Sequence, residues 1–339
     1  VVISSDVIYP SGAMKDYEAK FYLPFKGITK PVYAIPGNHD WYDALDGFVA
    51  AFFTPASART AIRARIASDD GISSTTEGML DGFVKRAEFL RSEYGVPTGF
   101  QQAPFFQVQT PSFALLAVDT GVLRGVDPEE LAWLKAALEA SRGKTIMAVL
   151  GHPFFAGGHD TSIGDDKFLE IRKLLQQYDV RLIMAGDTHD LEYYAEKRSD
   201  GATVHHWVNG GGGAYLSYGA PLAWPATPVT NDWAFYPGRE AALHKIESLT
   251  PWWKWPAWWW TRELNAWPSS AEWLSAMFDY NAAPFFQSFV VVTVDPAANR
   301  VTLRPWGVHG PLTWKDLDLS QGGVPPGGAL DGAVEWVVR

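Results

Sequence analysis

The stretch KPVYAIPGNHD, residues 30–40, indicates what kind of fold this chain adopts. It opens with a β-favouring run, Lys30–Ile35, and closes with the polar residues Gly37-Asn38-His39-Asp40. This order predicts a buried strand that ends in a polar turn. In α/β sheets, ligand-binding residues lie in the loops that follow the carboxyl ends of the strands. We therefore expect an α/β sheet with polar chemistry along one edge.

The same alternation continues through roughly the first 200 residues. Helical periodicity separates the apolar runs, at Pro128–Ser141 and at Asp166–Tyr178. Strands that alternate with helices are typical of an α/β sheet. The further expected strands are Val1–Ile8, Ser112–Val118, Thr145–Leu150 and Arg181–Ala185.

The chain is expected to fall into three parts. Residues 1–221 form the core, with a charge-rich helical insertion at about 55–102. Residues 222–281 form a second insertion, which holds 10 of the 16 tryptophans. Residues 282–339 add two paired strands, Phe285–Val294 and Arg300–Trp306, and an irregular tail that is rich in Gly and Pro at 321–328.

The composition excludes several classes of protein. Of the 339 residues, 47% are hydrophobic and 19% charged, so a large core is expected. The net charge is −10 and no basic block occurs, so no extended nucleic-acid surface is predicted. The absence of cysteine excludes disulfides, thiolate zinc sites and cysteine nucleophiles. No apolar stretch is long enough to predict a transmembrane helix.

Residues that suit metal binding lie at the ends of four expected strands. They are Asp6, Asn38, His152 and the segment GDTH at 186–189. Oxygen and imidazole ligands together suit Mn, Fe, Zn or Co better than Ca. Two such ions, held about 3.5–4 Å apart, can bridge a phosphate, activate a water and stabilise the departing oxygen. A shared carboxylate holds the ions this close, and Asp6 is the best candidate.

Taken in order, these residues resemble the motifs of the calcineurin-like metallophosphoesterases. The family motifs run D-x-H or D-x-G, G-D-x-x, G-N-H-[DE], G-H and G-H-x-H. The resemblance covers about Val1 to Tyr215 and resumes near Phe285. It implies a four-layer α/β/β/α sandwich with a dinuclear site at one edge of its two sheets. It also implies two divalent or trivalent metal ions, drawn from Mn, Fe, Zn and Mg, and a phosphate-ester substrate.

The resemblance implies a role for each site residue. Asp6 would bridge the metals. His39 would bind no metal; it would protonate the leaving oxygen or stabilise charge in the transition state, and Asp40 would hold it. The other implied ligands are Asn38 and His152 at the second metal and His189 at the first.

Three features depart from the family pattern. Ser5 stands where the family has glycine, which is a mild change if the backbone φ is negative there. Asp187 replaces the first histidine of G-H-x-H; a carboxylate can still bind metal and would favour Mn, Mg or Fe over Zn. No D-x-H or D-x-G motif precedes Asp6, and we expect that motif upstream of Val1 in the natural protein.

Two residues have two readings each. The run Asp6-Val7-Ile8-Tyr9 resembles the purple-acid-phosphatase branch, in which the tyrosine binds ferric iron, so Tyr9 is either a metal ligand or a packing aromatic. His159 lies in the loop AGGHD at 156–160. It either contacts the substrate phosphate or is an exposed loop histidine.

Other polar residues near these motifs read as structural. The segment NGGGGAY at 209–215 is not followed by Lys-Ser or Lys-Thr, so it does not predict a nucleotide loop. Family members often carry a glycine-rich turn at this point, near the site. His205, His206 and Asp119 are expected to be structural or to support the site.

The segment PWWKWPAWWW at 251–260 has three readings. It is a compact subdomain, a lid that selects a bulky substrate, or a peripheral membrane contact through Trp252–Trp260. In the last reading Lys254 and Arg262 would meet anionic lipid.

These observations favour an enzyme that hydrolyses a phosphomonoester or phosphodiester by a metal-bridged water. The alternative is a binding or membrane-associated module whose metal site has decayed, which Asp187 and the absent first motif favour. The joint retention of the other site residues opposes it. The sequence leaves the substrate, the compartment and the oligomeric state open.

Overall fold

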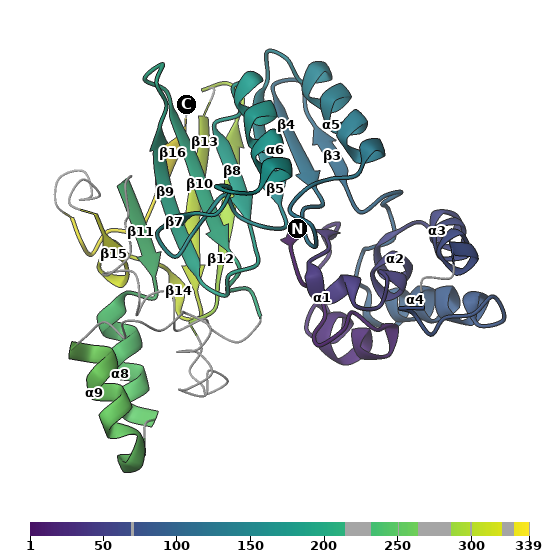
Figure 1. Cartoon of the computed structure of the whole chain (residues 1–339), viewed down its shortest axis with the longest axis horizontal. Helices are drawn as coiled ribbons and strands as arrows, with labels where there is room; N and C mark the ends of the chain where they lie inside the picture. Colours follow the sequence, from purple (N-terminus) through teal and green to yellow (C-terminus); the bar gives the residue numbers. More distant parts are fainter. Residues whose placement is uncertain are drawn as a thin grey trace. The chain divides into compact units, whose positions relative to one another are not determined.

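The computed structural model describes residues 1–68, 71–213, 232–249, 251–263, 286–298, 300–320 and 329–338 (Figure 1). Strands and helices alternate, and the predicted α/β fold class is confirmed. Two compact units make up the structure: residues 1–109, 114–142 and 148–152 form the first, and residues 110–113, 143–147 and 153–339 the second. Among the described residues no helix has the length and apolar character needed to cross a membrane.

In the first unit, two short parallel strands end at the same edge. β1 (Val2–Ser4) pairs with β2 (Tyr33–Ile35), so that Ile3 lies opposite Ala34. α1 (Asn38–Trp41) begins just after β2. The remaining elements are η1 (Met14–Asp16), η2 (Glu18–Tyr22), α2 (Asp46–Phe52), α3 (Pro55–Ser68), α4 (Leu80–Tyr94), β3 (Phe106–Gln109), β4 (Phe113–Val118), which pairs antiparallel with β3, and α5 (Pro128–Ala140).

The first strand is shorter than the predicted Val1–Ile8. Ser5 and Asp6 have φ angles of +133° and +33°, outside the β region, so the extended backbone ends at Ser4. The chain therefore turns at the residue that was expected to bridge two metals.

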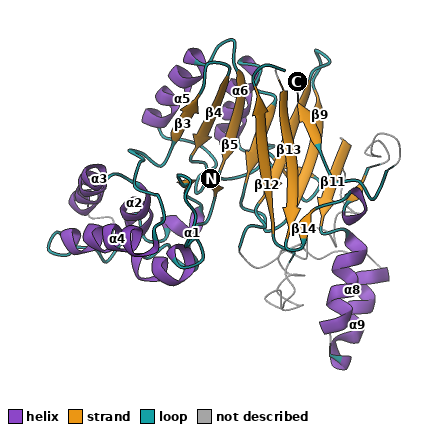
Figure 2. Cartoon of the chain, turned by 180° about the vertical axis from the view of Figure 1, so that it is seen from behind, coloured by secondary structure: helices purple, strands orange, loops and turns teal. Residues whose placement is uncertain are grey.

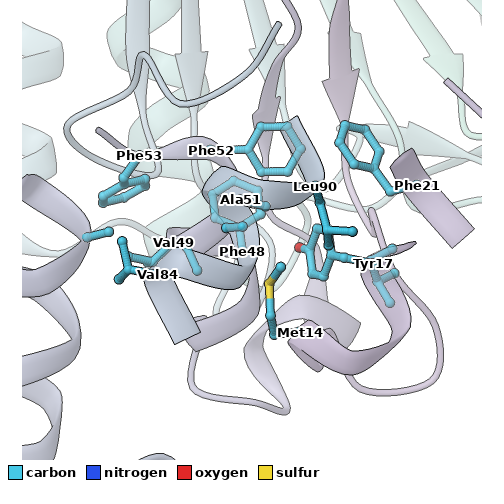
Figure 3. Close-up of a cluster of buried hydrophobic side chains, with 14 of the residues drawn as sticks. Met14, Tyr17, Phe21, Phe48, Val49, Ala51, Phe52, Phe53, Val84 and Leu90 are labelled. Carbon is cyan, nitrogen blue, oxygen red and sulfur yellow. The ribbon is translucent and has the colours of Figure 1, made fainter. Parts of the chain in front are cut away.

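The predicted helical insertion at about 55–102 shares the hydrophobic core of the first unit (Figure 3). Val84 and Leu90 of α4 are buried in the same cluster as Phe48 and Phe52 of α2. The ring centroids of Phe48 and Phe52 lie 4.9 Å apart. Since burial of one such side chain stabilises by about 1.5–3 kcal/mol, the insertion supports the segment that carries α1 and α2.

The second unit holds the later elements, and its boundary with the first passes through β4 and β5 (Thr145–Leu150). Its strands are β6 (Phe155–Ala156), β7 (His159–Asp160), β8 (Leu182–Ala185), β9 (Leu191–Lys197), β10 (Thr203–Asn209), β11 (Asp232–Tyr236), β12 (Ser288–Asp295), β13 (Arg300–Gly307), β14 (Gly310–Pro311), β15 (Asp318–Leu319) and β16 (Trp336–Val338). Its helices are α6 (Asp166–Gln177), α8 (Arg239–Leu249), η4 (Trp252–Lys254), α9 (Trp255–Glu263) and η5 (Trp314–Asp316).

Two sheets pack against each other in this unit (Figure 2). One has the order β15-β11-β9-β10-β8, and the other is β12-β13-β14 with β16 beside β13. The ring centroids of Trp207 on β10 and Trp336 on β16 are 4.6 Å apart, and Tyr193 on β9 lies 4.9 Å from Trp336. The predicted strand pair near the C-terminus is confirmed as antiparallel β12 and β13.

The predicted domain boundaries at 221 and 281 stay predictions. Residues 214–231 and 264–285 lie outside the described residues, as does the predicted irregular tail at 321–328.

Candidate functional site

Asp6 connects the turn after β1 to the start of α1. Its Oδ1 accepts a hydrogen bond of 2.9 Å from the backbone amide of His39, and its Oδ2 accepts one of 2.8 Å from the Tyr9 hydroxyl. The rings of Tyr9 and His39 have centroids 4.2 Å apart. Three of the predicted site residues therefore form one cluster in the first unit.

The imidazole of His39 is held by a backbone carbonyl. Its Nδ1 lies 2.8 Å from the carbonyl oxygen of Pro10, which can only accept a hydrogen bond. Nδ1 must therefore carry hydrogen, and Nε2 is the nitrogen at which a proton can be gained or lost. Tyr42 packs on the same ring at 5.0 Å between centroids.

Asp40 does not hold His39, so that prediction is wrong. The Asp40 carboxylate is buried and accepts backbone hydrogen bonds from Val7, Gly37 and Ile8 at 2.9, 3.1 and 3.3 Å. Burial raises the pKa of Asp40 to about 7, even though the three amide donors favour the charged form. Asp40 is the third residue of α1, and its side chain reaches back to the start of the helix. There it connects the backbone at Gly37 to the backbone at Val7 and Ile8, and it does not orient the His39 imidazole.

Asn38 is the first residue of α1. Its Nδ2 donates a hydrogen bond of 2.9 Å to the Tyr42 hydroxyl. This contact uses the amide nitrogen, so Oδ1 is the atom that suits a metal ion.

Three glycines bring the strand-end loops of the first unit into contact. A Cβ atom added to Gly37 would lie 2.1 Å from Asp6 Oδ1. A Cβ atom on Gly121 would lie 2.5 Å from the Pro36 carbonyl oxygen and 3.0 Å from the Gly37 Cα. A Cβ atom on Gly151 would lie 2.8 Å from the Gly121 nitrogen. Real Cβ atoms essentially never come so close, and only glycine lets the backbones meet at these points.

This stack brings the His152 loop to the loops that carry Asp6 and Asn38. The backbone amide of His152 also donates to Thr120 Oγ1 at 3.0 Å. Sequence reasoning missed Thr120 and Gly121. The signal that could have found them is the D-T-G triplet directly after a strand, at residues 119–121.

Asp119 supports this loop, as predicted. Its Oδ1 accepts from the Gly121 amide at 3.0 Å, while its own amide donates to Glu130 Oε1 at 2.7 Å. Burial raises the pKa of Asp119 to about 7 and that of Glu130 to about 9.

Asp187 and His189 belong to the second unit and follow β8. Asp187 has a φ of +74°, a conformation that aspartate tolerates better than most residues. A Cβ on Gly210 would lie 1.7 Å from the Thr188 carbonyl oxygen, so the glycine-rich turn packs directly on this segment. That the turn lies near a metal site stays a prediction.

His159 is exposed on the β6–β7 hairpin of the second unit. The hairpin is fixed by β9, because Glu192 accepts from the Gly157 amide at 2.9 Å and the Tyr194 hydroxyl accepts from the Gly158 amide at 2.8 Å. Both readings of His159 stay predictions.

The paired histidines on β10 are structural, as predicted. His205 Nδ1 lies 2.8 Å from the Tyr193 hydroxyl, and His206 Nε2 lies 2.8 Å from Glu196 Oε2. Burial lowers the pKa of both imidazoles, that of His205 to about 4.

The donor set of the first unit fits a metal ion in its chemistry. Asp6 offers a carboxylate, Asn38 an amide oxygen and His152 an imidazole, and this mixture suits Mn, Fe or Zn. The missing Cβ at Gly37 leaves the space that the Asp6 carboxylate occupies. Within the described ranges, however, no three or more His, Cys, Asp or Glu side chains gather closely enough to hold a metal.

The family model described as calcineurin-like phosphoesterase matches residues 1–191. A search of curated proteins found no match. Among solved structures, the GAP50 anchor of the inner membrane complex of Plasmodium is 16% identical, with a TM-score of 0.41 and 64% of each chain covered. A purple acid phosphatase, PPD1, from yellow lupin (Lupinus luteus) seeds is also 16% identical, with a TM-score of 0.39. That alignment covers 64% of this chain and 37% of the lupin protein.

Proposed function

Because this chain belongs to the calcineurin-like phosphoesterase family, we propose that it is a metal-dependent phosphoester hydrolase. Its substrate would be a phosphomonoester or a phosphodiester. The observation that carries the proposal is the contact between Asp6 Oδ1 and the His39 amide, at 2.9 Å. The contact supports the proposal because the carboxylate that would bind metal and the residue that would donate the proton are neighbours.

Asp6, Asn38 and His152 would bind metal from the first unit, and Asp187 and His189 stay predicted ligands from the second. Two bound ions would supply positive charge that binds the phosphate and lowers the pKa of the attacking water. Asp6 is pre-oriented for its role, because its two oxygens accept from different donors. The Tyr9 hydroxyl therefore orients Asp6, and direct metal binding by Tyr9 is the second role we propose for it.

His39 would act as the general acid. In its protonated form both ring nitrogens carry hydrogen. Nδ1 donates to the Pro10 carbonyl and stabilises the cation, while Nε2 holds the proton that passes to the leaving oxygen. Since the ring is also packed by Tyr9 and Tyr42, Nε2 keeps one direction.

A second candidate function is a phosphoesterase-like binding module without catalysis. One observation favours it: Asp187 stands where the family has the first histidine of G-H-x-H. The same experiment tests both candidates.

The test measures bound metal and turnover in the full-length protein. Metals would be determined by elemental analysis, and hydrolysis with p-nitrophenyl phosphate and its bis-ester in the presence of Mn, Fe, Zn or Mg. We expect about two metals per chain. His39→Ala should retain them but lose about 10²–10⁴-fold in kcat, while Asn38→Ala should lose both metal and turnover.

His244→Ala is the matched control, since His244 is an exposed histidine on α8. It should leave metal content and turnover unchanged. Less than about one metal per chain, with no turnover for any ion, would remove the enzyme and leave the binding module.

A further inference from the structure

The segment Pro251–Glu263 exposes a group of tryptophans. The side chains of Trp252, Trp253, Trp255 and Trp259 are 79%, 64%, 48% and 56% exposed. Tryptophan is a large side chain that normally gains by burial, and exposed groups of such residues mark interaction sites. Because these four side chains are exposed, packing in the core of the second unit does not explain their presence.

The fold builds this surface on a fixed support. Trp258 of α9 is buried, its ring centroid lies 5.2 Å from that of Trp255, and the Arg262 guanidinium lies 5.4 Å from it. Arg239 Nη2 of α8 donates to the Arg262 carbonyl at 3.1 Å. The Arg239 amide donates to Asp318 Oδ2 of β15 at 2.6 Å, which ties α8 to the sheet. The buried Trp258 therefore anchors α9, while Trp255 and Trp259 on the same helix are exposed.

Two cations, Lys254 and Arg262, belong to the same segment as the exposed indoles. Trp255 and Trp259 are one turn apart on α9, and Arg262 follows on the same helical stripe. Lys254 stands between Trp253 and Trp255 in sequence. Residues 251–263 contain Lys254, Arg262 and a single acid, Glu263, in a chain of net charge −10. Arg262 Nε lies 3.8 Å from Glu263 Oε1. Two cations and one acid give the segment a net charge of +1, opposite in sign to the −10 of the whole chain.

We propose that Pro251–Glu263 binds the surface of an anionic phospholipid bilayer. An indole has an apolar body and a polar N–H, so it is most stable in the headgroup layer. Cations beside it attract anionic headgroups. The nine residues of α9 are far fewer than the roughly 20 that span a bilayer, so the segment would lie in the interface. This inference does not depend on the proposed hydrolase.

The test is co-sedimentation of the full-length protein with vesicles. One set would contain phosphatidylcholine alone and the other phosphatidylcholine with phosphatidylserine. We expect binding to the anionic vesicles, which weakens as salt is added. The fourfold Trp→Ala variant at 252, 253, 255 and 259 should bind at least about tenfold more weakly. Brominated phospholipids should quench wild-type fluorescence more than that of the variant.

The control replaces exposed apolar side chains elsewhere, by Phe89→Ala and Ile163→Ala, and should bind as wild type does. A second variant, Lys254→Glu with Arg262→Glu, removes the cations and keeps every indole, so it tests the proposal if the fourfold variant fails to fold. Hydrolysis of soluble p-nitrophenyl phosphate should be the same in all variants, which separates this test from that of the hydrolase.

Two results would overturn the proposal. One is wild-type protein that does not sediment with anionic vesicles. The other is self-association, seen by light scattering, that the fourfold variant abolishes while vesicle binding stays equal in both proteins; the indoles would then contact a second copy of the chain.

Discussion

The buried carboxylate of Asp40 accepts a hydrogen bond of 2.9 Å from the backbone amide of Val7, 33 residues earlier in the chain. It also accepts from the amides of Gly37 and Ile8. One side chain thus joins the turn after β1 to the start of α1. The relative position of Asp6 and His39 follows from this junction.

Removal of the Asp40 carboxylate should destabilise the first unit. Asp40→Ala leaves three backbone amides without their acceptor, and we expect the free energy of unfolding to fall by about 2–4 kcal/mol. Asp40→Asn keeps one acceptor oxygen and should lose less. Urea denaturation at pH 8 measures both. Asp331→Asn, at an exposed carboxylate, is the control, and an Asp40→Ala protein as stable as this control would contradict the assigned role.

Ser5→Gly should stabilise the protein. The Ser5 φ of +133° lies where side chains are strained and glycine is not, so the change from the family's glycine is not the mild one that a negative φ would allow. We expect a gain of about 0.5–1 kcal/mol in the free energy of unfolding. Ser4→Gly, in β1, should instead lower the free energy of unfolding by about the same amount. A loss in both variants would show that Ser5 is unstrained.

Gly37→Ala should damage the candidate metal site directly. The new methyl would lie 2.1 Å from Asp6 Oδ1, so the carboxylate must move. We expect loss of most bound metal, read by elemental analysis, and a fall in kcat of at least about tenfold. Gly82→Ala in α4 meets no atom within 4 Å and should keep the metal. Equal metal content in the two variants would show that Asp6 binds none.

Glu130 should make stability fall as pH rises. Burial raises its pKa from near 4.5 to about 9. Between these values the folded chain holds a proton that the unfolded chain releases, so stability is fully present below about pH 4.5 and is lost toward pH 9. Glu130→Gln cannot titrate but keeps the oxygen that accepts from the Asp119 amide.

We therefore expect Glu130→Gln to be more stable than wild type at pH 8 and to show a shallower fall between pH 5 and 9 by thermal denaturation. A fall between about pH 4 and 7 should remain in both proteins, because burial also raises the pKa values of Asp119 and Asp40 to about 7. Glu129→Gln, at the exposed neighbour, should follow the wild-type curve. A Glu130→Gln curve that also follows the wild type would contradict the assigned burial.

Several elements could be predicted because their signals are local. The apolar runs that became β2, β4, β5 and β8 end in polar or glycine-containing turns, and α5 and α6 show helical periodicity, so neighbouring residues specify each element. For the same reason, the sequence could show that Asp6 and Asn38 each follow a strand, and these two strands, β1 and β2, are neighbours. The β12–β13 hairpin was readable from its turn.

Residue types and their spacing along the chain were thus enough to predict the α/β class and the family, and to name candidate site residues. They could not predict that Asp40 binds backbone amides while the Pro10 carbonyl holds His39, or that Ser5 has a positive φ. Nor could they predict that Gly37, Gly121 and Gly151 let their loops touch. Each of these depends on which backbone groups meet across long stretches of chain. A residue's type limits the bonds that it can make, but packing selects the partner.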